Sequence, residues 1–509
     1  MTAAQSQVDI QPLAGGSGLR RAAWRRTLLA CLAAVVAWAL LLVGPPRTGH
    51  EHVMTAVLMF CSLVVPVLVC FRSPAVAATG GLDFCQPGAV VALFYYFYMV
   101  VPSLHIWYAL DSQSNWVDPT WPPERLFNAT CALGLLGLLG FAMGYHARIG
   151  LLPVRGSQRL LRRLTTGWPP VAWPVITLMG LIGLGFRLKH LMAYGGLSLD
   201  LLRYLSPSFA IASNLQIGGI PEFLESMFDW AILLFVLRSV ISGKHKFLAV
   251  ALMGAGVVLV YVLTGKRTSV MPFLFFPLVW YHYLRRPITL RRGFAFLGGG
   301  LFLMAALLFM RTLGPVFASG ASLSGDAVTI ATQPVRFYLN SAELSVFDMT
   351  MMAIRDRAPI LHSIGGPVWG GFVNNLAPLA YLIPRFLWPT KPTFSDVGIV
   401  FFQRAVGDIA QQGFAVGVVG GLYLFGGVVG VALGMFLIGV VLRWAYDSVR
   451  PYLDKLWHVL LYSVFLWMTF MFLRFGTLGS TLLFFIQFQL VGVVAVFGIA
   501  MWRKPQPAS

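Results

Sequence analysis

Charged residues are scarce in this chain of 509 residues, and acidic residues are the scarcest of them. Lys, Arg, Asp and Glu make up only 11% of the sequence, against a hydrophobic share of 58%, and 37 basic residues stand against 18 acidic ones. A soluble globular domain carries about 25% charged residues, so the composition excludes that class. The mean hydropathy of +0.77 indicates a polytopic membrane protein.

Cysteine is also sparse, and the five cysteines have neither a metal-type spacing nor a pattern that implies disulfides. The sequence contains no Gly-x-x-x-x-Gly-Lys-Ser/Thr nucleotide loop, and no Asp-x-Asp motif or His cluster in it suggests a metal site. The net charge of +19 is spread over short segments and forms no continuous basic stripe, which argues against nucleic acid as a partner. We therefore expect chemistry without a metal or another cofactor.

What the chain has instead is a series of apolar runs about 20 residues long, the length that a helix needs to cross a bilayer. They predict an all-α membrane protein with about twelve transmembrane helices. The expected organisation is a cytoplasmic tail (1–24), nine helices (25–311), a large outer loop (312–413), three helices (414–502) and a second tail (503–509). The expected spans lie near 27–44, 53–71, 88–107, 128–146, 171–187, 223–242, 247–264, 269–284, 293–311, 422–443, 456–473 and 480–501.

The positions of Lys and Arg set the expected orientation. With both termini in the cytoplasm, the inner segments hold more than half of the Lys and Arg, and the outer segments hold most of the Asp and Glu. The outer loop 312–413 is too long for an ordinary connection and too apolar for disorder. Its piece 361–384 is expected to lie along the membrane surface or to dip into it. The run 414–443 is too long for one span, so its first part is a candidate re-entrant segment.

Several cations fall on the outer side, where this rule disfavours them. For a single arginine at the tip of a span, snorkelling to the surface is the ordinary explanation. Lys266 and Arg267, however, share a four-residue turn with no carboxylate near them in sequence. A cluster of such cations needs an anion, and Arg and Lys together suit the oxygens of a diphosphate. The expected diphosphate-binding residues are Lys266, Arg267, Arg385, Lys391, Arg474 and Arg187.

A diphosphate on the outer side implies a lipid-linked donor, because nucleotides are cytoplasmic. Aromatic rings in the outer loop suit sugar faces, although interfacial anchoring is the ordinary role of such residues. The expected sugar-binding residues are Trp369, Tyr381 and Trp388. A sugar hydroxyl that attacks the donor benefits from a general base. His362 and Glu343 are favoured for that role over Asp348, Asp396 and Asp408, and each of them is equally explained as a solvated loop residue or an ion-pair partner.

Three motifs carry a resemblance to a known family: GKR at 265–267, IPRFLWPTKP at 383–392 and GLYLFGGVVG at 421–430. They are similar to elements of the bacterial oligosaccharide repeat-unit polymerases, the O-antigen polymerases of the Wzy type. The resemblance implies a GT-C-type membrane glycosyltransferase in the bacterial inner membrane. It would join undecaprenyl-diphosphate-linked repeat units at the periplasmic face into O-antigen or exopolysaccharide. Leu422 stands where we associate an acidic residue with the family, so a carboxylate role at that position is not carried over.

Two alternatives remain open at this stage. A transporter or flippase of lipid-linked oligosaccharide would place charges near the bilayer midplane and would tend to show two similar halves, and no internal repeat is visible. A ligase that transfers the finished polymer to an acceptor would have much the same architecture and arginines. For the polymerase, the resemblance implies lipid-linked donor and acceptor, with membrane lipids, a flippase and a chain-length regulator as candidate partners.

Overall fold

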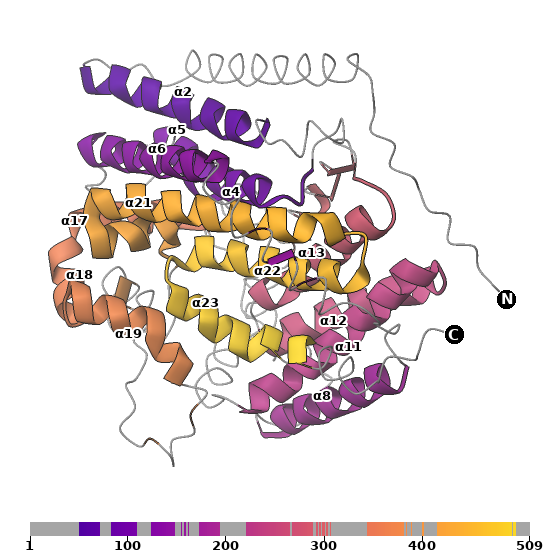
Figure 1. Ribbon diagram of the computed structural model, residues 1–509. Helices are drawn as coiled ribbons and strands as arrows, with labels where there is room; N and C mark the ends of the chain where they lie inside the picture. Colours follow the sequence, from indigo (N-terminus) through magenta and orange to yellow (C-terminus); the bar gives the residue numbers. More distant parts are fainter. Residues whose placement is uncertain are drawn as a thin grey trace, which may run out of the picture.

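Every regular element that the structure describes is a helix (Figure 1). The computed structural model describes residues 50–71, 83–108, 124–147, 173–193, 220–264, 267–288, 344–380, 415–490 and 492–494, with isolated residues between 154 and 161, 292 and 306, and 383 and 401. The expected tails and the first expected span, 27–44, lie outside these residues, as does most of the ninth, 293–311.

Helices occupy the expected spans wherever those residues are described, although the expected span near 422–443 is interrupted at Gly427. In chain order they are α2 (His50–Phe71), α4 (Pro87–Tyr95), α5 (Val101–Tyr108), α6 (Glu124–His146), α8 (Trp173–Ala193), α11 (Ile220–Ser242), α12 (Lys246–Thr264) and α13 (Arg267–Leu284). A π-helical turn, η1 (Tyr96–Val100), joins α4 to α5. The last helices are α21 (Gly417–Val449), α22 (Leu456–Phe475) and α23 (Leu478–Phe484), with the short turns η4 (Arg450–Tyr452) and η5 (Phe485–Gln489).

The expected outer loop is itself helical where it is described. It contains α17 (Val346–Arg355), α18 (Arg357–Ser363) and α19 (Pro367–Ala380). Glycines at 365 and 366, both with positive φ, separate α18 from α19. A loop of this size with its own packed helices is typical of a functional segment rather than a linker.

Four helical segments in the described part of the chain are long and apolar enough to cross a membrane: Pro87–Trp107, Arg125–His146, Gly417–Tyr452 and Leu456–Phe475. Shorter apolar helices accompany them, among them Lys246–Tyr261 and Ser269–Leu284. The protein is therefore an all-α membrane protein.

Contacts between helices show the relative directions of two packed pairs. Trp280 of α13 donates a hydrogen bond to Ser463 of α22 (3.0 Å), and Phe275 contacts the ring of Trp467, so these two helices are antiparallel. By contrast, Gly140 of α6 packs against the carbonyl of Ala432, and Gly144 one turn later packs against that of Phe436. Residue numbers rise together along α6 and α21, so these helices are parallel, and the glycines let their backbones touch.

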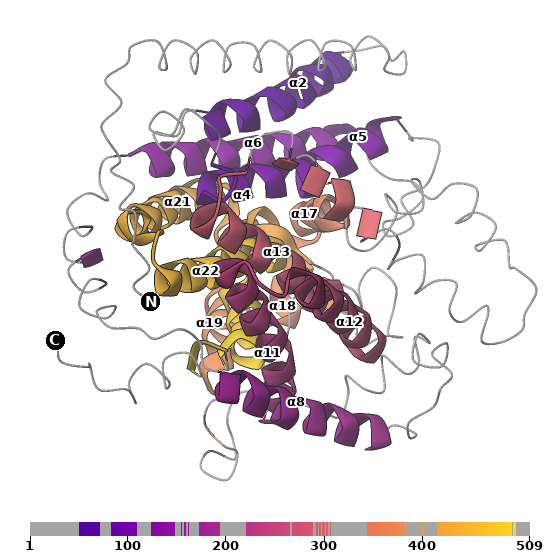
Figure 2. The same cartoon turned by 90° about the vertical axis from the view of Figure 1, so that its right-hand side faces the viewer.

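The bundle has three layers (Figures 1 and 2). Helices α2 and α6 lie on one side and α8 and α11 on the other, with α13, α21 and α22 between them. The interior is strongly aromatic, and Trp230, Trp280 and Trp467 are fully buried in it. We call the end where α6 begins and α22 ends the outer end, following the expected orientation, and the opposite end the inner end. Helices α17, α18 and α19 gather at the outer end (Figure 1).

Candidate functional site

The outer end is organised around a break in α21. Gly427 has φ 62° and ψ −155°, a conformation that is essentially restricted to glycine. The chain reverses there, because a Cβ added to Gly430 would lie 2.7 Å from the carbonyl oxygen of Leu422, and one on Gly434 would lie 2.6 Å from the Leu422 side chain. Element α21 is therefore two helices side by side, a short leg (417–426) and a long leg (428–449). Only the long leg is long enough to cross the membrane.

The break explains the contacts of two residues of the glycine-rich motif, Leu422 and Leu424. Leu422 fills the space between the two legs, at the position where the family resemblance would have placed a carboxylate. In an unbroken helix the carbonyl of Leu424 would accept a hydrogen bond from a backbone N–H of the next turn, but the chain turns back at Gly427. The Leu424 carbonyl instead accepts a hydrogen bond from Nε of Arg357 (3.0 Å), whose guanidinium also lies over the ring of Tyr423, 5.7 Å from its centroid. Arg357 of α18 is thus held at the break.

A buried carboxylic acid lies in the helix beside the short leg. Helix α17 packs against this leg where Thr350 meets Gly420 and Val346 meets Gly417. Asp348 in α17 is buried, and its Oδ1 atom has no hydrogen-bond partner among the residues that the structure describes. Burial raises the pKa of Asp348 from 3.8 to about 7, because the charged form loses its hydration. At neutral pH this carboxyl group can accept or release a proton, as a general base must.

A second arginine approaches the short leg from the central layer. Arg474, in the last turn of α22, is only 8% exposed. Two residues later the backbone of Gly476 lies against Gly417 and Gly421, where a side chain would collide with carbonyl oxygens. The start of the short leg is therefore packed tightly against the end of α22. Arg357 is bonded to the end of this leg, and Arg474 stands two residues before Gly476, which packs on its start. Asp348 lies in α17, on the side of that helix opposite Val346 and Thr350, which face the leg.

Helix α19 completes the outer end. A Cβ on Gly371 would lie 3.3 Å from the ring of Phe425 in the short leg. Asn375 accepts a hydrogen bond through Oδ1 from the backbone N–H of Leu478 (2.8 Å), so α19 satisfies one of the free N–H groups at the start of α23. Helices α19 and α23 lie beside each other (Figure 1). This contact joins the outer loop to the last helices of the chain.

The residues expected from the sequence are distributed unevenly over this site. Arg474 lies at the outer end, as do His362, exposed near the end of α18, and Trp369, exposed on α19 and stacked on Phe372 (5.8 Å between ring centroids). Arg267 begins α13, and Trp388 is an isolated exposed residue. Five other expected residues lie outside the described part of the chain: Lys266, Glu343, Tyr381, Arg385 and Lys391.

Arg187 does not fit the expectation of an unpaired cation. It is buried in α8, and its Nη2 lies 2.6 Å from Oδ1 of Asp229 in α11. Its guanidinium also lies over the ring of Phe228, 5.1 Å from the centroid. The carboxylate already balances its charge, so we no longer include Arg187 among the diphosphate ligands.

The structure favours two residues, Asp348 and Arg357, more strongly than the sequence does. Arg357 is not among the residues expected from the sequence, and the sequence favours His362 and Glu343 over Asp348 as a base. The arginine nearest to Asp348 in sequence, Arg355, forms an ion pair with Asp356, with Nη2 of Arg355 2.7 Å from Oδ2 of Asp356. The only sequence signal was the expected outer location of both residues. Burial and the break at Gly427 depend on contacts between distant segments.

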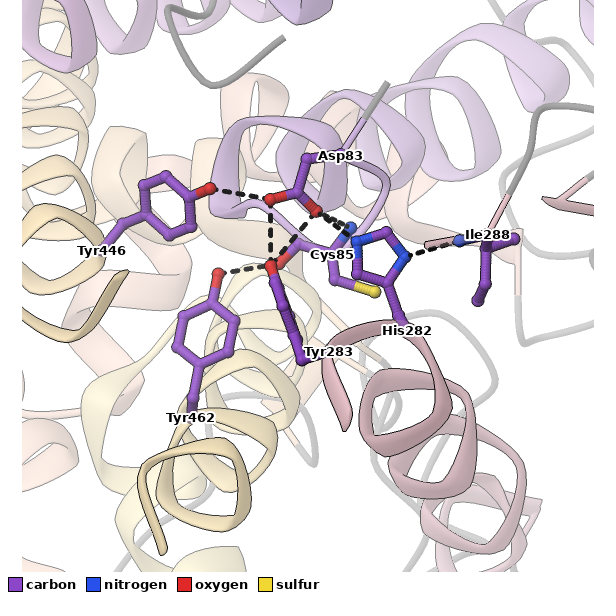
Figure 3. A network of polar contacts seen from close by, with 7 residues as sticks. All are labelled: Asp83, Cys85, His282, Tyr283, Ile288, Tyr446 and Tyr462. Carbon is purple, nitrogen blue, oxygen red and sulfur yellow. Dashed lines mark hydrogen bonds and ion pairs between the residues drawn. The ribbon is translucent and has the colours of Figure 1, made fainter. Parts of the chain in front are cut away.

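A second polar cluster lies at the inner end and is centred on Asp83 (Figure 3). Its carboxylate accepts hydrogen bonds from the hydroxyl groups of Tyr446 (2.7 Å) and Tyr283 (3.0 Å) and from the N–H of Cys85 (3.0 Å). Nε2 of His282 lies 3.2 Å from Oδ1. Burial alone would raise the pKa of Asp83, but the contacts with His282, Tyr446 and Tyr283 lower it below its usual value. The cluster ties α13 and α21 to the segment before α4.

Asp83, Cys85 and His282 are also residue types that bind metals, and their ligand atoms lie within 4.8 Å of one another. The orientation of His282 argues against such a site. The N–H of Ile288 donates a hydrogen bond to Nδ1 of His282 (3.1 Å), so the ring proton is on Nε2 and points to Asp83. A metal on Nε2 would require that proton on Nδ1, directly against the N–H of Ile288. The geometry therefore favours a hydrogen-bonded clamp that fixes the inner end.

Comparison with known proteins adds no relative: no family model, no curated protein and no solved structure matches this chain.

Proposed function

We propose that this protein is a bacterial inner-membrane glycosyltransferase that joins lipid-diphosphate-linked oligosaccharide units into a cell-surface polysaccharide, with its reaction centre at the outer end. One observation carries the proposal. Arg357 is bonded to a broken helix, and two helices that pack on the same helix carry Arg474 and the buried carboxyl of Asp348, all at the end of the bundle that holds the packed outer loop. Cations and a base with a pKa near 7 are the groups that displacement of a diphosphate by a sugar hydroxyl needs.

In this reaction the acceptor hydroxyl oxygen attacks the anomeric carbon of the donor sugar. The bond from that carbon to the diphosphate oxygen breaks, and the diphosphate leaves with the electron pair on its lipid. Arg357 and Arg474 stabilise its growing negative charge, together with Lys266, Arg267, Arg385 and Lys391 as expected from the sequence. The hydroxyl proton passes to a general base. We favour Asp348 over His362 and Glu343 for that step, because burial gives its carboxyl group the pKa of an effective base at neutral pH.

A transporter of the same lipid-linked substrate is the second candidate, and the break itself favours it. Secondary transporters bind substrates at discontinuous helices, and ionisable groups at membrane depth, such as Arg187 with Asp229, are frequent in them. A ligase for the finished polymer would use the same outer site as a polymerase. Partners remain as expected from the resemblance: lipid-linked donor and acceptor, membrane lipids, a flippase and a chain-length regulator.

Surface glycan analysis separates these functions. A strain that lacks the gene would be complemented with the wild-type chain, with Arg357→Ala, with Arg474→Ala and with the matched control Arg355→Ala. Arg355 belongs to the neighbouring helix α17 and pairs with Asp356. Glycan lengths on the carrier lipid and on the cell surface would be measured by gel electrophoresis, with protein levels in the membrane determined in parallel.

If the protein is a polymerase, the strains with Arg357→Ala and Arg474→Ala will carry only single repeat units on the outer face. The strain with Arg355→Ala will make full-length chains. Single units trapped on the cytoplasmic face would instead identify a transporter. Long chains that stay on the carrier lipid would identify a ligase. Normal long chains in both arginine variants would refute the assigned site.

A further inference from the structure

Helix α19 presents an apolar face that no described part of the protein covers. Its 14 residues, PVWGGFVNNLAPLA, include no charged side chain. Five large apolar side chains are between 40% and 85% exposed: Val368, Trp369, Phe372, Leu376 and Leu379. Because the spacing of 368, 372, 376 and 379 follows the helical repeat, these side chains form one stripe along the helix. Water would solvate such a stripe poorly.

The other face of α19 is firmly attached to the protein. Gly371 packs on Phe425, and Asn375 accepts the hydrogen bond from Leu478 at the start of α23. The side-chain amides of Asn374 and Asn375 donate to backbone carbonyls one turn earlier, those of Gly370 (2.8 Å) and Gly371 (2.7 Å). The side-chain amide of Asn375 is therefore fully used within the protein, Asn374 is buried beside it, and the apolar stripe of α19 faces away from the bundle.

The same exposure pattern occurs on a helix that is long enough to cross the membrane. Along the long leg of α21, every fourth residue is an exposed aliphatic side chain: Val429, Leu433, Leu437 and Val441. On a transmembrane helix such a stripe is the surface that contacts lipid. Helix α19 has the same kind of stripe and lies beside α23 at the level of the outer end (Figure 1).

We propose that α19 is inserted into the outer leaflet, where its stripe is covered by lipid hydrocarbon. A helix of 14 residues is about 21 Å long, too short for a hydrocarbon core about 30 Å thick, so α19 enters from the outer side and does not cross. This placement makes Trp369 a lipid contact rather than a sugar platform. It also puts the broken helix, through Gly371 and Phe425, next to lipid, and it does not depend on the proposed function.

Site-specific photo-crosslinking of the full chain in lipid vesicles tests this placement. The crosslinking amino acid p-benzoylphenylalanine would replace Phe372 or Leu376 in the α19 stripe. Leu437 on the long leg is the positive control, and the exposed Ala358 of α18 is the matched control at the same end of the bundle. The vesicles would contain phosphatidylcholine with an alkyne at the end of an acyl chain, and adducts would be quantified by fluorescent labelling after irradiation.

The expected result is lipid adduct at 372 and 376 in amounts similar to those at 437, with background labelling at 358. Lipid adduct at 437 together with background at both α19 positions would overturn the proposal. Crosslinks from 372 or 376 to a second copy of the chain, in place of lipid, would also overturn it and would identify the stripe as a subunit interface. Neither outcome would affect the polymerase assay, which reads glycan length.

Discussion

Replacing Gly427 by alanine tests the break in α21, on which the whole outer end depends. At φ 62° and ψ −155° an alanine side chain clashes with its own backbone, and such strained positions cost about 1–3 kcal/mol. Neighbouring Gly426 is the control, because its φ is not positive and a Cβ there would meet no atom within 4 Å. In a helix, Gly426→Ala would be neutral or stabilising by up to about 1 kcal/mol. Adjacent glycine-to-alanine changes are thus expected to have opposite effects.

The assay is unfolding of the purified protein in detergent micelles by increasing sodium dodecyl sulfate, followed by tryptophan fluorescence and circular dichroism. Gly427→Ala should shift the folded-to-unfolded ratio by at least about fivefold toward unfolding. It should also release Arg357 from Leu424 and lower glycan polymerisation per folded molecule. Equal unfolding curves for both variants, or a more stable Gly427→Ala protein, would refute the reversal of the chain at Gly427.

Two further predictions concern buried charges. The raised pKa of Asp348, about 7 against 3.8 for the unfolded group, means that the folded state holds its proton more tightly. The wild-type protein should therefore lose about 3 kcal/mol of stability between pH 4 and 7 relative to Asp348→Asn, and equal pH profiles would contradict this. Arg187→Ala leaves Asp229 buried without its partner, so the free energy of unfolding should fall by about 3–5 kcal/mol in the same assay. Polymerisation per folded molecule should stay unchanged. Selective loss of polymerisation at normal stability would instead return Arg187 to the diphosphate site.

The sequence predicted the helices well, because length and apolar character alone decide whether a segment can cross a bilayer. The length of the run 414–443 also indicated more than a single straight span, and the reversal at Gly427 divides the helix there into two legs. These features are local. A run of apolar residues or a glycine pair carries its structural consequence within a few neighbouring positions.

The candidate site was harder to predict because its contacts are distant in sequence. The partner of Arg187 is 42 positions away, and the carbonyl that holds Arg357 is 67 positions away. Nothing in the local sequence marks Asp348 as buried, since α17 is surrounded by residues from α6, α21 and the segment near 360. Residue types and topology can indicate that outer cations meet an anion. Which cations are already paired depends on how the helices pack.

Reconstitution of the purified protein tests the central claim most directly. Single lipid-linked repeat units, extracted from the strain that lacks the gene, would be incorporated with the protein into vesicles, and glycan length on the carrier lipid would be followed with time. The account predicts a ladder of longer glycans with the wild-type chain and with Arg355→Ala, and only single units with Arg474→Ala. Single units that cross the vesicle membrane without being joined, or no change in glycan length with the folded wild-type chain, would contradict it.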